Sequence, residues 1–211
     1  MCGKILLSTS YFPPVEYMTL IYGADDILIE REENYIKQTY RNRCNILAAN
    51  GPLALTVPVL TLRQPKVLIR DIRIDYSKRW QQVHYRAIIS AYRSAAFFEY
   101  FFDPVEKVIF GDHQFLIDLN MASAEALLIS LKIDRKIRYT DHYEADTGDP
   151  SDFRYRITPK NRKGNTEMNH NRYFQVFSNK YSFVPGLSFL DMLFNLGPDS
   201  VRYLSAGKTN S

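Results

Sequence analysis

Cysteine is scarce in this sequence. Two of the 211 residues, Cys2 and Cys44, are cysteines, and neither stands in a Cys-x-x-Cys pair or in a cluster with histidine. A structural zinc site usually needs four such ligands, so zinc ligation has little support, and we predict no metal and no other cofactor. The shortage also favours a reducing compartment over the disulfide-forming environment of secreted proteins.

Long apolar runs are absent as well. No run approaches the roughly 20 residues of a membrane-spanning helix, and the apolar stretch that begins at Ile5 is far shorter than a signal peptide requires. We therefore predict a cytoplasmic protein without membrane insertion.

Charge of one sign does not dominate the chain. The 27 Lys and Arg residues face 23 Asp and Glu residues, which leaves a net charge of +4, and both signs are interspersed. This balance argues against a nucleic-acid partner. Hydrophobic residues make up 45% of the chain, which is enough for a core, and we predict one domain over residues 1–211.

A β-α-β unit is predicted at the N-terminus. Residues 4–9 form a short apolar run that Pro13 and Pro14 stop, residues 16–22 show helical spacing, and residues 27–29 form a second apolar run. This order of strand, loop, helix and strand is typical of a β-α-β unit.

A long β-hairpin is predicted next, over about residues 35–59. The residue types of positions 35–47 favour a strand, Asn50 and Gly51 give a strong hairpin signal, and apolar residues alternate from Leu53 onward. Further short strands are predicted at residues 67–69, 137–140 and 173–177.

The second half of the chain is predicted to be mainly helical. Asp103 and Asp112 each mark a helix start, and Ser188 heads a capping box whose helix ends at Gly197. A buried stripe recurs at spacings of three and four through Trp80, Val83, His84, Ala87, Ile88, Ala91 and Ala95. The predicted fold class is therefore α/β, with a mixed sheet, an N-terminal β-α-β start, a long hairpin and a helical second half.

Residues 144–172 lose apolar periodicity and have the composition of a long polar loop. Basic residues from Arg154 to Lys163 alternate there with aromatic residues. Two interpretations stay open: a solvated surface, or a segment that closes over an anionic ligand. No recognisable RNA- or DNA-binding motif accompanies these residues.

The segment Lys37-Gln38-Thr39-Tyr40-Arg41-Asn42-Arg43 is the leading candidate for a binding site. On a strand with a period of two, Lys37, Arg41 and Arg43 share one face, and Gln38 and Asn42 share the other. Cations spaced in this way can converge on a phosphate or carboxylate. The alternative is the solvated outer face of a hairpin, and the two amides either orient a ligand or fasten a neighbouring loop.

The loop from Tyr11 to Glu16 follows a buried strand and precedes a helix N-terminus, where open α/β sheets bind ligands. It contains no glycine, so a ligand there would meet side chains such as Tyr11 and Glu16. Glu16 also has a simpler explanation, because a carboxylate in the first turn complements the helix dipole. His84 is either a general base or a core histidine with satisfied hydrogen bonds.

The chain resembles the WbqC-like proteins of bacteria along nearly its whole length. The resemblance rests on the strings Tyr11 to Tyr17, Lys37 to Arg43, Leu55 to Val59, Trp80 with His84, and Leu187 to Asn195. Such proteins occur among genes for O-antigen and other surface-polysaccharide synthesis. The resemblance implies a cytoplasmic role on nucleotide sugars or on their acyl or aminoacyl decorations.

The leading hypothesis is a transferase-type enzyme that acts on a sugar or nucleotide sugar in surface-polysaccharide biosynthesis. A small anionic or sugar ligand would be bound by Tyr11, Lys37, Gln38, Arg41, Asn42 and Arg43. His84 or Glu16 would move a proton. The rival is a non-catalytic accessory protein that binds a polysaccharide-biosynthesis enzyme through an aromatic surface, since the chain contains 15 Tyr and 13 Phe.

Overall fold

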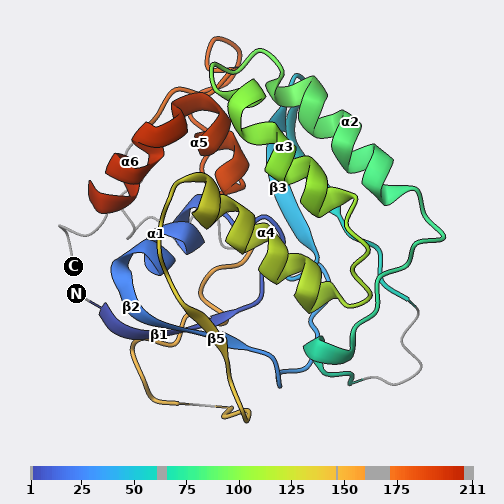
Figure 1. Cartoon of the computed structure of the whole chain (residues 1–211), viewed down its shortest axis with the longest axis vertical. Helices are drawn as coiled ribbons and strands as arrows, with labels where there is room; N and C mark the ends of the chain where they lie inside the picture. The colour runs from blue at the N-terminus through green and yellow to red at the C-terminus, as the bar shows by residue number, and fades with distance from the viewer. Residues whose placement is uncertain (1, 61–65, 146, 160–171, 207–211) are drawn as a thin grey trace.

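The computed structural model describes residues 2–60, 66–145, 147–159 and 172–206. These residues form a three-stranded sheet, a separate two-stranded sheet and a set of helices packed around a common core (Figure 1). The predicted α/β class is confirmed. The main elements are β1 (Cys2–Ser8), α1 (Val15–Gly23), β2 (Ala24–Glu30), β3 (Arg43–Ala48), β4 (Gly51–Thr56), α2 (Trp80–Tyr92), α3 (Phe98–Ile109), α4 (Leu116–Ser130), β5 (Ile137–Tyr139), α5 (Phe189–Leu196) and α6 (Ser200–Ala206).

The predicted β-α-β unit is confirmed. Strand β1 pairs in parallel with β2, so that Ile5 lies opposite Ile27 and Leu7 opposite Ile29. All four of these side chains are buried in the core. Strand β5 adds a third parallel strand on the other side of β2, which gives the order β1-β2-β5. Helix α1 connects β1 to β2, and the chain after β5 turns back along the sheet (Figure 1).

The hairpin is confirmed, but it is shorter than predicted. Strands β3 and β4 are antiparallel and joined by a turn at residues 49–50, with Ala48 opposite Gly51. Residues 35–42 are not a strand. Gln38 has a φ of 60°, which a regular strand does not contain, and Tyr40 and Arg41 are both buried although they are neighbours in sequence.

Three of the helix predictions need correction. Helix α3 begins at Phe98, and Pro104 lies inside it, because the rings of Phe98 and Phe102 stack at 4.5 Å on the side of the helix that meets Phe194. The packing of these rings outweighs the helix-start signal at Asp103. Helix α4 begins at Leu116, four residues after the predicted start. On α2, Val83 is 60% exposed and leaves the predicted buried stripe.

Of the three further short strands, residues 137–140 are confirmed as β5. Residues 67–69 are not a strand, since Leu68 forms one isolated bridge with Asn34 and the chain then enters a 3-10 turn, η1 (Ile69–Asp71). Residues 173–177 are not a strand either. Their side chains bond across the core, where the hydroxyl of Tyr173 donates to Asp191, and Nε2 of Gln175 donates to the same carboxylate.

Helix α5 begins and ends at the residues that its capping signals predict. Ser188 caps α5 by accepting a hydrogen bond from the backbone N–H of Leu190. Gly197 ends this helix with a φ of 54° and leads through a second 3-10 turn, η3 (Gly197–Asp199), into α6. Both predicted ends of this helix are therefore confirmed.

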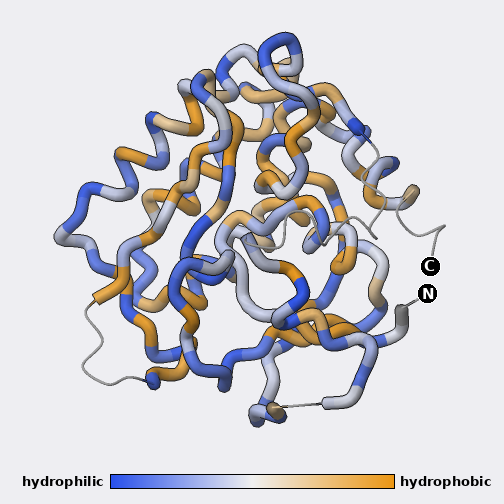
Figure 2. The backbone as a smooth tube through the Cα atoms, turned by 180° about the vertical axis from the view of Figure 1, so that it is seen from behind, coloured by the Kyte–Doolittle hydropathy of each residue, from blue (hydrophilic) through white to orange (hydrophobic). Residues whose placement is uncertain are grey.

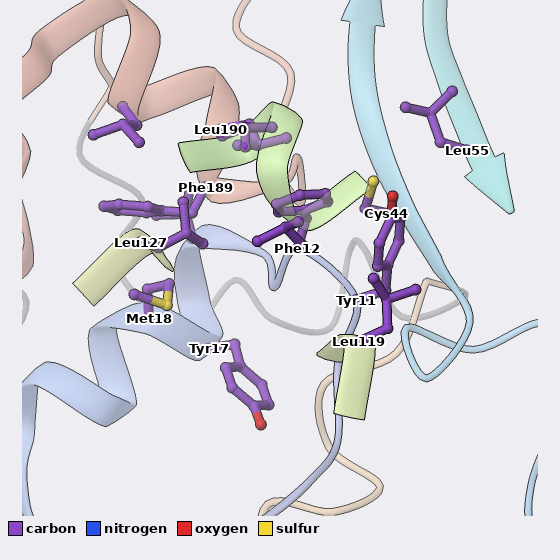
Figure 3. Close-up of a cluster of buried hydrophobic side chains, with 14 of the residues drawn as sticks. Tyr11, Phe12, Tyr17, Met18, Cys44, Leu55, Leu119, Leu127, Phe189 and Leu190 are labelled. Carbon is purple, nitrogen blue, oxygen red and sulfur yellow. The ribbon is translucent and has the colours of Figure 1, made fainter. Parts of the chain in front are cut away.

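The core joins residues from distant parts of the chain. In Figure 3, Phe12 lies among Leu127, Phe189 and Leu190, while Tyr11 points to the region of Cys44 and Leu119. Hydrophobic stretches lie along the strands and helices, and many outer loops are hydrophilic (Figure 2). No helix in the described part of the chain is long and apolar enough to cross a membrane.

Candidate functional site

A cavity of about 450 Å³ lies on the face of the β1-β2-β5 sheet that the core does not use. We call it the trough. Its floor is made by alternate residues of β2, namely Asp26, Leu28 and Glu30, because Ile27 and Ile29 point into the core. Its remaining walls come from Lys4, Ile5 and Leu6 of β1 and from residues of β5 and the segment after it, including Arg138 to His142, Glu144, Thr147, Asp149, Ser151 and Asp152.

The segment after β5 is fixed to the sheet by main-chain bonds. Leu6 donates its N–H to the carbonyl of Ser151 at 3.1 Å, and Phe153 donates its N–H to the carbonyl of Leu6 at 2.8 Å. Part of the predicted 144–172 loop therefore runs beside β1 as an ordered wall. The basic residues Lys160, Arg162 and Lys163 lie outside the described residues.

Arg154 holds the two residues that form the end wall of the trough, Glu30 and Asp152, where strand β2 has its carboxyl end. Its side chain is fully buried, and Nη1 donates to Glu30 at 3.0 Å while Nη2 donates to Asp152 at 2.6 Å. Burial disfavours the charged form of Arg154, but the hydrogen bonds and charge of Asp152 outweigh burial and raise its pKa. The guanidinium therefore keeps its charge, and the pKa of Asp152 is lowered by the same contact.

Glu30 lines the trough although it is only 1% exposed. Its Oε1 accepts from the hydroxyl of Thr140 at 2.6 Å and from the N–H of Glu32 at 2.8 Å, and its Oε2 accepts from Arg154. Both oxygens are thus held in fixed positions. A carboxylate so oriented at the end of a parallel strand lies where open α/β sheets bind ligands.

A second buried arginine stands behind this end wall. Nε and Nη2 of Arg41 donate to the two oxygens of Glu33 at 2.9 and 2.5 Å, and Nη2 also donates to the hydroxyl of Ser8 at 2.6 Å. Ser8 in turn donates to the carbonyl of Arg154. The ring of Tyr155 lies 5.7 Å from the guanidinium carbon of each arginine, so it contacts both.

A histidine and a carboxylate stand together at the open side of the trough. Nε2 of His142 lies 3.1 Å from Oε1 of Glu144, and both side chains are exposed. An imidazole whose one nitrogen bonds a carboxylate leaves the other nitrogen to accept a proton, which is the arrangement of a general base. In the described part of the chain, no group of three or more His, Cys, Asp or Glu side chains is placed to hold a metal ion.

The structure does not bring the cations of the Lys37–Arg43 segment to one face. Lys37 and Gln38 are exposed in a turn, Arg41 is buried against Glu33, and Arg43 is half-buried at the start of β3. The prediction that Lys37, Arg41 and Arg43 share one face was wrong because residues 37–43 do not form a continuous strand. Asn42 fastens the chain, since its Nδ2 donates to the carbonyl of Val57 at 3.2 Å.

Tyr11 and His84 form a buried pair within the core. The hydroxyl of Tyr11 lies 3.0 Å from Nδ1 of His84, and Trp80 packs edge-on against the imidazole with its ring centre 5.2 Å away. Burial lowers the pKa of His84 to about 4, so the imidazole is neutral at pH 7. This placement matches the core-histidine interpretation.

Glu16 points away from the trough. It is buried in the first turn of α1, and it lines a small hollow together with Tyr173 and Tyr203. Tyr17, the next residue, lies near Arg41 and Arg154 instead, and its hydroxyl donates to the carbonyl of Ser8 at 2.8 Å. The two candidate catalytic residues Glu16 and His84 therefore lie outside the residues that line the trough, and their catalytic role stays a prediction.

The strings that carry the family resemblance meet around the loop from Tyr11 to Pro14. The N–H of Tyr11 bonds the carbonyl of Tyr40, and the N–H of Phe189 bonds the carbonyl of Pro13. Phe12 has a φ of 34°, a strained value that the bond from its N–H to the hydroxyl of Ser123 helps to hold. The shared strings thus build the loop at the carboxyl end of β1.

Comparison with known proteins identifies a family whose sequence model covers this loop. The sequence model of the WbqC-like protein family matches residues 9–166, which is most of the chain and includes this loop and the end wall of the trough. The chain belongs to the WbqC-like protein family. It is also 27% identical over 224 residues to an uncharacterised protein of Mycobacterium tuberculosis, Rv1507c, in an alignment that covers 94% of this chain and 96% of that protein. No solved structure matches the chain significantly.

Sequence reasoning did not place Glu30, His142 or Glu144 at a binding site, and it did not predict that Arg154 would be buried. One signal was present. Glu30 directly follows the apolar run of β2, and His142 stands three residues after β5, so both lie where parallel strands end. The burial of Arg154 had no local signal, because its partner Glu30 is 124 residues away.

Proposed function

We propose that this WbqC-like protein is a transferase-type enzyme that acts on a sugar or sugar-linked ligand bound in the trough. The observation that carries the proposal is a cavity of about 450 Å³ with carboxylates and hydroxyls on its walls and the His142–Glu144 pair at its open side. A cavity of this size suits a small molecule.

Sugar hydroxyls both donate and accept hydrogen bonds, and the walls offer partners for both. Glu30 and Asp152 accept, and so can Thr140 and Thr147, whose hydroxyls already donate to these carboxylates, while Lys4 and Arg138 donate. Since Arg154 and Thr140 already hold Glu30 in place, binding a ligand requires little reordering of that carboxylate. The walls therefore support recognition of a polyhydroxylated ligand.

In the proposed acyl transfer, His142 accepts the proton of the sugar group that attacks the carbonyl carbon of an acyl thioester. The carbon–sulfur bond breaks, and the proton passes to the thiolate that leaves. Glu144 holds the imidazole and stabilises its charged form. This assigns the proton transfer to a residue of the trough in place of His84 and Glu16. We assign the reaction to the acyl or aminoacyl decoration of sugars for surface polysaccharides, a role that the family resemblance supports.

Arg41 supports the end wall in this proposal. Its charge is matched by Glu33, and its contact with Ser8 helps to position the main chain beside Arg154. Lys37, Gln38 and Arg43 remain candidate contacts for a phosphate or carboxylate that extends beyond the trough, and Tyr11 and Asn42 hold the adjacent loop.

The test replaces His142 with asparagine and compares it with His113→Asn at the turn before α4. Purified variants are incubated with a panel of sugars or nucleotide sugars and acyl thioesters, and product formation is followed by mass spectrometry. We expect His142→Asn to retain sugar binding but to lose about 10²–10⁴-fold in turnover, and His113→Asn to match the wild type. Turnover that is equal in both variants contradicts the role of His142.

The accessory-protein alternative rests on a different observation. Tyr100 is 78% exposed and Phe174 is 62% exposed, and large exposed aromatic side chains are enriched in interfaces. A stable partner recovered with the protein from its native host, together with no turnover of any sugar by the isolated chain, favours this alternative over the enzyme.

A further inference from the structure

The trough has a charge opposite to that of the chain as a whole. The chain carries a net charge of +4, so cations outnumber anions overall. The trough is lined by two cationic residues, Lys4 and Arg138, and by the six carboxylates of Asp26, Glu30, Asp141, Glu144, Asp149 and Asp152. This concentration of negative charge is a property of the cavity and does not follow from the composition.

Ion pairs neutralise part of this charge but not all of it. Arg138 pairs with Asp26 at 2.6 Å, and the single charge of Arg154 faces both Glu30 and Asp152. Asp149 accepts the N–H of Ser151, which is a neutral donor, and Glu144 contacts His142. Asp141 interacts electrostatically with Arg138, which already pairs with Asp26, and Asp149 forms no ion pair with another described residue. The negative charge of the trough therefore exceeds the charge of its arginines and lysine.

We infer that the ligand of the trough carries a protonated amine, and that its chemical class is an amino sugar. The inference rests on the proposed function, which supplies the sugar. A cavity with excess carboxylates repels a phosphate or carboxylate and attracts a cation, while its hydroxyls bind the rest of the sugar ring. A neutral sugar makes the same hydrogen bonds without the attraction between charges.

Three probes that differ at one carbon test this inference: D-glucosamine, N-acetyl-D-glucosamine and D-glucose. Calorimetry at a pH where the amine is protonated, and at low ionic strength, measures their affinities for the full chain. We expect glucosamine to bind at least about tenfold more tightly than the other two, with an advantage that shrinks as salt screens the charges.

Variants separate a charge effect from a change in fold. Asp149→Asn keeps the shape of the side chain and its acceptor oxygen but removes its charge, and the matched control is Glu99→Gln at an exposed position of α3. We expect Asp149→Asn to weaken glucosamine binding several-fold and leave glucose binding unchanged. The control should change neither affinity, and circular dichroism checks that both variants fold.

The outcomes distinguish the inference from the proposed function. Glucosamine that binds no more tightly than glucose overturns the amine assignment, while the binding of glucose keeps a sugar ligand in place. Spermidine, a polyamine without a sugar ring, is measured as a fourth probe. If it binds and glucosamine does not, the amino-sugar assignment is overturned, because the trough then selects charge and not the sugar. Absence of binding by all three sugars removes both the inference and the sugar ligand on which it rests.

Discussion

At the closed end of the trough, the guanidinium of Arg154 contacts Glu30, Asp152 and the carbonyl oxygen of Glu144. These partners come from β2 and from the chain after β5. A buried ion pair is strongly destabilised when one partner is removed, because the remaining charge stays out of contact with water. The structure of this end of the trough therefore depends on the charge of Arg154.

Replacing Arg154 with alanine is therefore expected to lower the free energy of unfolding by about 3–5 kcal/mol, since it leaves Glu30 buried without its cation. Urea unfolding measures the change. Arg156→Ala is the matched control: Arg156 is exposed and contacts the ring of Phe153, so its loss should cost less than about 1 kcal/mol. Similar losses in the two variants contradict a structural role for the buried guanidinium.

At the scale of elements, the ends of α5 and the hairpin turn followed their residue signals, while the starts of α3 and α4 and the lengths of the strands did not. Ser188 and Gly197 bracket α5 as expected, because a side-chain cap and a glycine with positive φ act within a few residues. The segment from Tyr35 to Asn42 has strand-like composition, but contacts of Tyr40 with Gly186 and of Arg41 with Ser8 hold it in turns. Long-range contacts outweighed local propensity there.

Gly197 offers a test of one such element boundary. An added Cβ at this position would lie 2.5 Å from the ring of Phe97, and the φ of 54° with a ψ of −130° suits glycine. We expect Gly197→Ala to lower stability by about 2–3 kcal/mol, seen as a lower Tm. Gly3→Ala is the control, because an added Cβ there meets no atom within 4 Å. An unchanged Tm for Gly197→Ala contradicts the strained helix end.

At the scale of the whole molecule, the core encloses ionisable groups whose protonation is linked to folding. His84 is 2% exposed, and burial lowers its pKa to about 4, below the value of about 6.5 in an unfolded chain. Its contribution to stability is fully present above pH 6.5. It is lost as the pH falls through about 4, because the unfolded chain binds the proton more tightly.

The wild type is therefore expected to lose up to about 3 kcal/mol relative to His84→Gln when the pH falls from 7 to 4. Urea unfolding of both proteins at several pH values measures this difference, in which the titration of other groups cancels. If the difference does not change with pH, His84 titrates alike in the folded and unfolded chains. That result contradicts the burial of His84 and favours a solvent-accessible position for its imidazole.

The sequence by itself determined the β-α-β start, the position of the hairpin turn, the C-terminal capped helix and the family. These features depend on residues close together in the chain, or on strings that a family shares. The charged end wall was decided by the tertiary structure alone. Arg154 meets Glu30 across 124 residues, and its burial depends on how the chain after β5 returns to β1. A periodic pattern describes one element, and it carries no information on which distant charges that element will meet.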